Sequence, residues 1–267
     1  APWASILPEG TESREGWEVA ERDLGAGQLS PIVIAVKAPG NILEHNAIRT
    51  LYNYAHNLEV KPGVRRVESI VTLNTSPPMT LDQYLAAYSS SERIASPELL
   101  EILLNLASDD TTMISVYTDF APVSDEAKAF VRELRLEPIG GNFTKLVTGS
   151  TADLMDANDN MYRYFPLVIL YVVATIYVIL LILFRSVILP LKAVMMNAMS
   201  IFASYGALVF IFQQGHLGSV LGFTAQGSLE TTLPIILFCI LFGLSMDYEV
   251  FLLSRIKEIY DETGQNT

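Results

Sequence analysis

The sequence predicts an α+β domain followed by an α-helical membrane bundle of three spans. One observation is charge: residues 1–160 hold 12 Lys/Arg and 23 Asp/Glu, a net −11, whereas residues 161–267 hold 5 and 6, a net −1, and the two add to the total of −12. The other is that apolar runs of membrane-spanning length occur only in the second part. We therefore expect a water-exposed acidic domain over 1–160 and a membrane domain over 161–267.

Three apolar runs are each long enough for a helix to cross the hydrocarbon core, which takes about 20 residues. They cover residues 165–184, 189–212 and 233–254. Arg185 and Lys192 join the first two runs, and Arg255 and Lys257 follow the third, so the positive-inside rule places these residues in the cytoplasm. Three spans then place the acidic domain on the other side. The sequence predicts a multi-pass integral protein of the cytoplasmic (inner or plasma) membrane with an extracytoplasmic domain.

The acidic domain reads as alternating strands and helices. Strand patterns cover 31–36, 63–71, 112–118 and 145–148, and helical patterns cover 43–58 and 124–134. A helical insertion over 77–107 separates the two halves, and Thr80 with Gln83 three residues later forms a capping pattern at its start. Two β-α-β units in this order predict a ferredoxin-like domain.

The residues that carry most catalytic and metal chemistry are sparse. His45, His56 and His216 are scattered, Cys239 is the lone cysteine, and no HExxH, paired-cysteine, GxSxG or phosphate-loop motif is present. We therefore expect no enzyme, no metal site and no cofactor. The acidic domain has no cluster of Lys/Arg to neutralise phosphates, which argues against a nucleic-acid partner.

Asp247 is the most informative residue, because it lies inside the third apolar run, in the segment GLSMDYEVFLLSR from Gly243 to Arg255. A carboxylate near a helix centre costs about 2.5–3.5 kcal/mol on insertion scales, so such groups usually face a bundle interior and handle ions or protons. With 1.5 Å per residue, Asp247 lies about 21 Å from Leu233, still within hydrocarbon. A neighbouring helix that brings or removes a hydrogen-bond donor can change whether Asp247 holds a proton. The alternative is a permanent packing contact.

Four further polar or small residues can support Asp247. Gly243 and Ser254 share its helical face, and this small-polar face should meet other helices. Glu249 lies on nearly the opposite side and needs a separate partner or extends toward the cytoplasm. Asn197, in the second run, is more often a packing residue in lipid than a functional group.

The quoted segment extends into a wider resemblance. LPEGTESREGW (7–17), FRSVILPLKAVMMNAMSIFASYGALVFIFQ (184–213) and LGFTAQGSLETTLPIILFCILFGLSMDYEVFLLSRIKEIYDETG (221–264) together resemble the MmpL family of the resistance-nodulation-division (RND) superfamily. SMDYEVFLLSR resembles the form of this motif in the second half of such proteins. By that resemblance the chain would be a second porter domain with spans eight to ten.

The resemblance implies a function and partners. Members of this family export lipids or other hydrophobic molecules with the proton-motive force, and Asp-Tyr pairs in their spans carry the protons, a role that falls on Asp247 and Tyr248. The first half, its matching Asp-Tyr pair and the last two spans have no counterpart in these residues. We therefore expect a fragment that is completed by the rest of its transporter or by a second chain. The other reading is a non-transporting membrane receptor or assembly scaffold related to sterol-sensing proteins, in which Asp247 only holds helices together.

Overall fold

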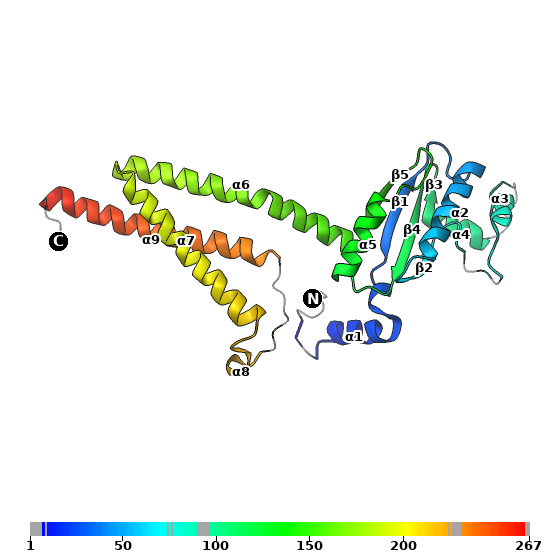
Figure 1. The fold of residues 1–267 in the computed structure, drawn as a ribbon, viewed down its shortest axis with the longest axis horizontal. Helices are drawn as coiled ribbons and strands as arrows, with labels where there is room; N and C mark the ends of the chain where they lie inside the picture. Colours follow the sequence, from blue (N-terminus) through cyan, green and yellow to red (C-terminus); the bar gives the residue numbers. More distant parts are fainter. Residues whose placement is uncertain are drawn as a thin grey trace. The chain divides into compact units, whose positions relative to one another are not determined.

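The computed structural model describes residues 7–8, 10–73, 75, 77–89, 97–223, 225 and 231–264. The chain divides into two compact units, Ala1–Ala157 and Asn158–Thr267. The first, here called the head unit, carries the sheet, and the second, the membrane unit, carries long apolar helices (Figure 1).

The head unit combines one sheet with helices. Its elements are α1 (Glu12–Leu24), the 3-10 turn η2 (Ala26–Gln28), β1 (Ile32–Lys37), α2 (His45–Glu59), β2 (Val64–Glu68), α3 (Leu81–Ser89), α4 (Pro97–Leu106), β3 (Ala107–Ser108), β4 (Thr111–Thr118), α5 (Asp125–Leu136) and β5 (Thr144–Thr148). The strands run in the order β2-β4-β1-β5, every neighbouring pair is antiparallel, and β3 pairs with the start of β4. The units β1-α2-β2 and β4-α5-β5 are therefore interleaved in one sheet.

The core of the head unit follows from the alternation of side chains along the two central strands. Ile34 on β1 lies opposite Ile114 on β4 and Val147 on β5, and both isoleucines are fully buried. Leu51 on α2 and Val131 on α5 are also fully buried and belong to the same hydrophobic cluster. Apolar residues two apart on the strands and three or four apart on the helices thus produce one core.

Local signals explain where the helices begin and where one predicted strand ends early. The Ser124 hydroxyl accepts a hydrogen bond from the Ala127 amide, which caps α5, and the Gln83 carboxamide accepts one from the Thr80 amide before α3. The strand predicted over 63–71 ends at Glu68, because the Thr72 hydroxyl donates to the Val67 carbonyl and turns the chain. The expected extent of this strand was therefore wrong by three residues.

Helix α6 (Ser150–Phe184) starts in the head unit and contains the boundary between the two units. Gly149 precedes it at φ +108°, where a side chain would also meet the Pro31 carbonyl oxygen at 2.7 Å. The Thr151 hydroxyl donates to the Pro122 carbonyl at 2.8 Å. Arg135 on α5 donates to both carboxylate oxygens of Asp156, at 2.6 and 2.7 Å. The first two turns of α6 are thereby part of the head unit.

The membrane unit contains the three long apolar helices that the sequence predicted. Besides the rest of α6 it holds α7 (Ile188–Leu208), the π-helical turn η4 (Val209–Gln213), the short helix α8 (Gly218–Leu221) and α9 (Leu233–Thr263). By length and composition, the described segments Ser150–Phe184, Ile188–Gln213 and Leu233–Thr263 can cross a membrane. These three helices are the structural evidence that the chain lies partly in a membrane.

Packing within the membrane unit centres on α7 and α9, which cross each other in Figure 1. Its buried apolar side chains are Leu180 on α6, Ala193 and Ile201 on α7, and Phe238, Phe242 and Met246 on α9. Even in the apolar windows of the three helices only 6%, 11% and 17% of the residues are buried. Most of the apolar surface is therefore left for lipid or for further helices.

The core of the head unit gives a first prediction. Ile114→Ala should lower the free energy of unfolding by about 2–5 kcal/mol, because it removes a fully buried side chain on the central strand β4, opposite Ile34 of β1. Met113 is the neighbouring residue on the opposite, more exposed face of the same strand. Met113→Ala should therefore lower the free energy of unfolding by less than about 1 kcal/mol. Pulse proteolysis of the detergent-solubilised chain across a urea series measures both values, and equal losses would contradict the assigned register.

The Arg135–Asp156 pair gives a second prediction. The Arg135 guanidinium lowers the pKa of Asp156 below its usual value, so this carboxylate adds stability above the unfolded-state pKa and loses it as the pH falls through the folded-state pKa. Because about half of the Asp156 side chain is exposed, we expect only about 0.5 kcal/mol. The difference in unfolding free energy between wild type and Asp156→Asn should be present at neutral pH and vanish in acid. A difference that grows in acid would contradict the assignment.

Candidate functional site

Helix α9 carries the predicted proton-relay residues. Local signals at its two ends explain where it begins and where it stops. Pro234 occupies its first turn, where a missing amide hydrogen costs little. Gly264 ends it in the left-handed conformation, at φ 66°, with its amide bonded to the Tyr260 carbonyl. Arg255 and Glu258 form an ion pair of 2.6 Å in the last turns, beyond the apolar run. The helix therefore continues past the expected end of the span at residue 254.

One face of α9 packs against its neighbours. Phe238, Phe242 and Met246 follow each other at intervals of four residues, and each is at most 7% exposed. The Phe238 ring meets Phe165 of α6 edge to face, with ring centroids 5.6 Å apart. On α7, Ala193, Asn197 and Ile201 repeat the same spacing and are equally buried. These two stripes define the contact of α7 with α9.

Asn197 and Glu249 meet within this contact. The Asn197 amide nitrogen donates a hydrogen bond of 3.0 Å to Glu249 Oε2, Asn197 is 5% exposed, and Glu249 is half-buried. Sequence reasoning named both residues as supporting groups but did not pair them. The available signal was the occurrence of one strong donor and one strong acceptor in two adjacent apolar runs.

Asp247 and Tyr248 lie away from this contact. With about 100° between successive residues, Asp247 is about 160° and Tyr248 about 100° from Glu249 around the helix. Asp247 is exposed and Tyr248 is 76% exposed within the described chain, and Gly243 and Ser254 are exposed as well. Among the described residues, the Asp247 carboxylate has no hydrogen bond or ion pair. The structure thus brings Asn197 to Glu249, and it leaves Gly243, Asp247, Tyr248 and Ser254 uncovered.

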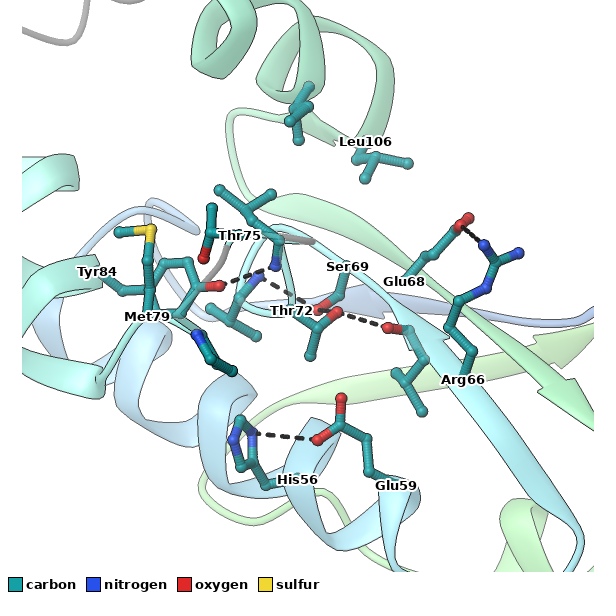
Figure 2. A pocket seen from close by; sticks show the side chains of 15 residues that line it. His56, Glu59, Arg66, Glu68, Ser69, Thr72, Thr75, Met79, Tyr84 and Leu106 are labelled. Carbon is teal, nitrogen blue, oxygen red and sulfur yellow. Dashed lines mark hydrogen bonds and ion pairs between the residues drawn. The ribbon is translucent and has the colours of Figure 1, made fainter.

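A cavity of about 650 Å³ in the head unit was not predicted from the sequence (Figure 2). Its wall is formed by α2, β2, the segment 69–79, α3 and α4. Its apolar part includes Met79 and Leu106, Tyr84 contributes an aromatic ring, and aliphatic hydroxyl groups come from Ser69, Thr72 and Thr75. The sequence contains no motif that predicts this cavity, because its residues come from five separate segments.

The charged groups at this cavity are already partnered inside the protein. Arg66 contacts Glu68 at 3.0 Å and lies over the Tyr117 ring, 4.1 Å from its centre. The Tyr117 hydroxyl donates to Glu68, and burial together with this carboxylate raises the pKa of Tyr117. His56 lies 3.9 Å from Glu59. The part of the wall without such partners is apolar or hydroxylic, which suits an apolar or amphipathic ligand better than an ion.

Residues that commonly bind metals are dispersed in the described structure. Across the part of the chain that the structure describes, no three His, Cys, Asp or Glu side chains come together as a metal-binding group. The three histidines are spread over both units, and Cys239 is an exposed free thiol on α9.

Comparison with known proteins adds relatives to this geometry. The chain is 32% identical over 256 residues to the "Mycolic acid-containing lipids exporter MmpL11" of Mycolicibacterium smegmatis, a match that covers 95% of this chain and 24% of the relative. It is 32% identical over 257 residues to the "Heme uptake protein MmpL11" of Mycobacterium tuberculosis, covering 95% and 23%. It is 33% identical over 163 residues to the "Trehalose monomycolate exporter MmpL3" of Mycobacterium tuberculosis, covering 60% and 17%.

The chain thus spans about a quarter of the length of the first two of these relatives. The MMPL family matches residues 5–267, which include the head unit from near its start, all three long helices and the SMDYEVFLLSR segment. This chain therefore belongs to the MMPL family of the RND superfamily.

Proposed function

We propose that this chain is part of a transporter that exports lipids or other hydrophobic molecules and is driven by the proton-motive force. The observation that carries the proposal is the pair Asp247–Tyr248, which lies within the apolar helix α9 on a side that α7 does not cover. A carboxylate at this depth is costly unless it has a partner or a proton. Its presence in the apolar part of this helix favours a role in carrying protons.

The chemistry of the pair suits proton transfer. A carboxylate can accept a proton or a hydrogen bond, and a phenolic hydroxyl can donate and accept at the same time. A helix that approaches Asp247 and then withdraws changes the balance between its two protonation states. Each proton that crosses the membrane releases about 2.3 kcal/mol per 100 mV of potential, which can drive the movement of the bundle.

The pair needs partners that the described residues do not supply. Asp247 and Tyr248 are exposed, and most of the apolar surface of the three helices is exposed as well. The much greater length of the relatives supports the idea that further helices come from the rest of the same transporter or from a second chain. No cofactor enters this account, because the membrane potential supplies the energy.

The head unit is the proposed porter domain, with a ferredoxin-like fold. The order β2-β4-β1-β5, with the two β-α-β units interleaved, supports that fold. Arg185 and Lys192 beside the link between α6 and α7, and Arg255 and Lys257 near the end of α9, support a cytoplasmic position for these helix ends. The head unit would then be extracytoplasmic, and the protein would lie in the cytoplasmic membrane.

The substrate class rests on the relatives and on the cavity of the head unit. Two relatives are named as lipid exporters and a third, at the same 32% identity as the first, as a heme uptake protein. What these cargoes share is a large hydrophobic part, which fits the apolar and hydroxylic wall around Met79 and Tyr84. We propose that this cavity lies on the substrate passage.

Replacement of Asp247 tests the proton relay. Asp247→Asn in the intact transporter should reduce export to background, because an amide cannot take up and release a proton, and Tyr248→Phe should slow export by removing the hydroxyl. Export of a fluorescent phospholipid from energised vesicles measures both. Glu258→Gln, at the exposed end of α9, is the matched control and should leave export unchanged. Normal export by Asp247→Asn would refute the relay, and loss of the folded protein in this variant would favour the scaffold reading.

Filling the cavity tests the substrate passage. Met79→Trp should reduce phospholipid export about tenfold, the effect of losing ~1.4 kcal/mol of binding, because the larger ring occupies space that the substrate would need. Leu136→Trp places the same side chain at an exposed position of α5 outside the cavity and should leave export intact. The same vesicle assay decides between them, and unchanged export with a folded Met79→Trp protein would exclude the cavity from the passage.

A further inference from the structure

We propose that the hydrogen bond between Asn197 and Glu249 is a positioning contact, which fixes the rotation of α9 on α7 and so turns Asp247 and Tyr248 away from α7. The inference rests on the proposed proton relay and adds to it a determinant of where the relay faces. Asn197 and Glu249 are positioning residues here, since neither contacts the Asp247 carboxylate.

The apolar contact alone does not define the rotation of α9. Its sequence from Leu233 to Leu244 is apolar almost all the way round, so several faces of the helix could pack on α7 at similar cost. Phe238 and Phe242 are buried in the cluster that α9 forms with its neighbours, but exposed aliphatic side chains on other faces, such as Ile240 and Leu244, offer alternatives. Two polar contacts join these helices: the Tyr205 hydroxyl donates to the Pro234 carbonyl at the start of α9, and the Asn197 amide donates to Glu249. A contact between two side chains can select one rotation of the helix, because every other rotation leaves it unmade.

Asn197 and Glu249 have the position that this selection needs. Asn197 lies in the middle of the stripe Ala193–Asn197–Ile201 and, among the described residues of the membrane unit, is the one buried polar side chain. Glu249 lies within about 20° of both Phe238 and Phe242 around α9. The hydrogen bond of 3.0 Å therefore extends the apolar stripe instead of competing with it.

The consequence for the relay follows from helical geometry. With Glu249 held against α7, Asp247 is about 160° away and faces the opposite side of the helix. It is exposed there, so α6 does not cover it either. If α9 rotated about its axis by one residue, about 100°, Asp247 would no longer lie on the side of α9 opposite α7. The contact thus presents the relay to a helix beyond the described residues.

The hydrogen bond needs an oxygen at position 249 but no charge. Either protonation state of Glu249 offers an acceptor to the Asn197 amide, and so does the carbonyl oxygen of a glutamine. Glu249→Gln should therefore preserve the positioning, whereas Glu249→Leu and Asn197→Leu should abolish it. Asn197→Asp alone places two carboxylates opposite each other and should break the contact. The double variant Asn197→Asp/Glu249→Gln exchanges donor and acceptor and should restore the hydrogen bond.

The test uses the intact transporter in membranes and two readouts. The first is the rate at which dicyclohexylcarbodiimide modifies Asp247, followed by peptide mass spectrometry, which reports the surroundings of this carboxylate without any need for transport. The second is the pH dependence of fluorescent-phospholipid export, which loss of folded protein alone would not shift. Abundance and detergent stability of each variant serve as folding controls.

We expect the modification rate of Asp247 to change about three- to tenfold in Glu249→Leu, Asn197→Leu and Asn197→Asp, with a shifted pH profile of export. Glu249→Gln and the exchanged double variant should stay within about twofold of wild type. Wild-type modification in Glu249→Leu, or a double variant no better than Asn197→Asp, would overturn the positioning role. A shifted profile with Glu249→Gln would overturn it too, since Glu249 would then itself titrate during transport.

The proposed function and this inference can fail separately. Export by Asp247→Asn refutes the relay, yet the modification rates in the Asn197 and Glu249 variants still decide whether the pair orients α9. If Asp247→Asn is inactive while every variant of the pair behaves as wild type in both readouts, the relay stands and the positioning role is wrong.

Discussion

The cost of placing a carboxylate in hydrocarbon governs the arrangement of the membrane unit. A charged carboxylate without a partner is costly within the hydrocarbon, so Asp247 needs a polar neighbour, a bound proton or water. The described chain does not cover it, because the face of α9 that packs on α6 and α7 is the one that carries Phe238, Phe242 and Glu249. The exposed position of Asp247 is therefore best understood as one side of a site whose other side is supplied by further helices.

The two units of the chain bury and expose opposite kinds of side chain. The head unit folds around a sheet whose alternation of side chains separates water from core, and its charged groups pair at the surface or around the cavity. The membrane unit instead has apolar side chains outside, and the polar contact between Asn197 and Glu249 lies inside. Helix α6 begins in the first unit, where Arg135 and Thr151 hold it, and ends in the second. This division matches a protein that works both in water and in lipid.

Much of the fold could be predicted from the sequence, because its strongest signals are local. The alternation at Ile32–Val36, the caps at Ser124 and Thr80, and the long apolar runs each indicate an element by short-range physics. Helix α1 gave no such signal, since it is charged and has no buried residue. The early end of β2 depended on the Ser69 and Thr72 hydroxyl groups, and strand pairing across the insertion is a long-range property. Pattern reasoning on one segment does not reach these.

The site was predictable in its residues but not in its pairing. An intramembrane aspartate is conspicuous by cost alone, whereas the partner of Glu249 depends on which face of α9 meets α7. We propose that Asp247 gains and loses a proton as the transporter works. Infrared difference spectra of the intact transporter, recorded between high and low pH and assigned with Asp247→Asn, detect this proton. We expect a protonated-carboxyl band that changes with pH in the wild type and is absent from the variant; an identical spectrum in both would rule out the relay.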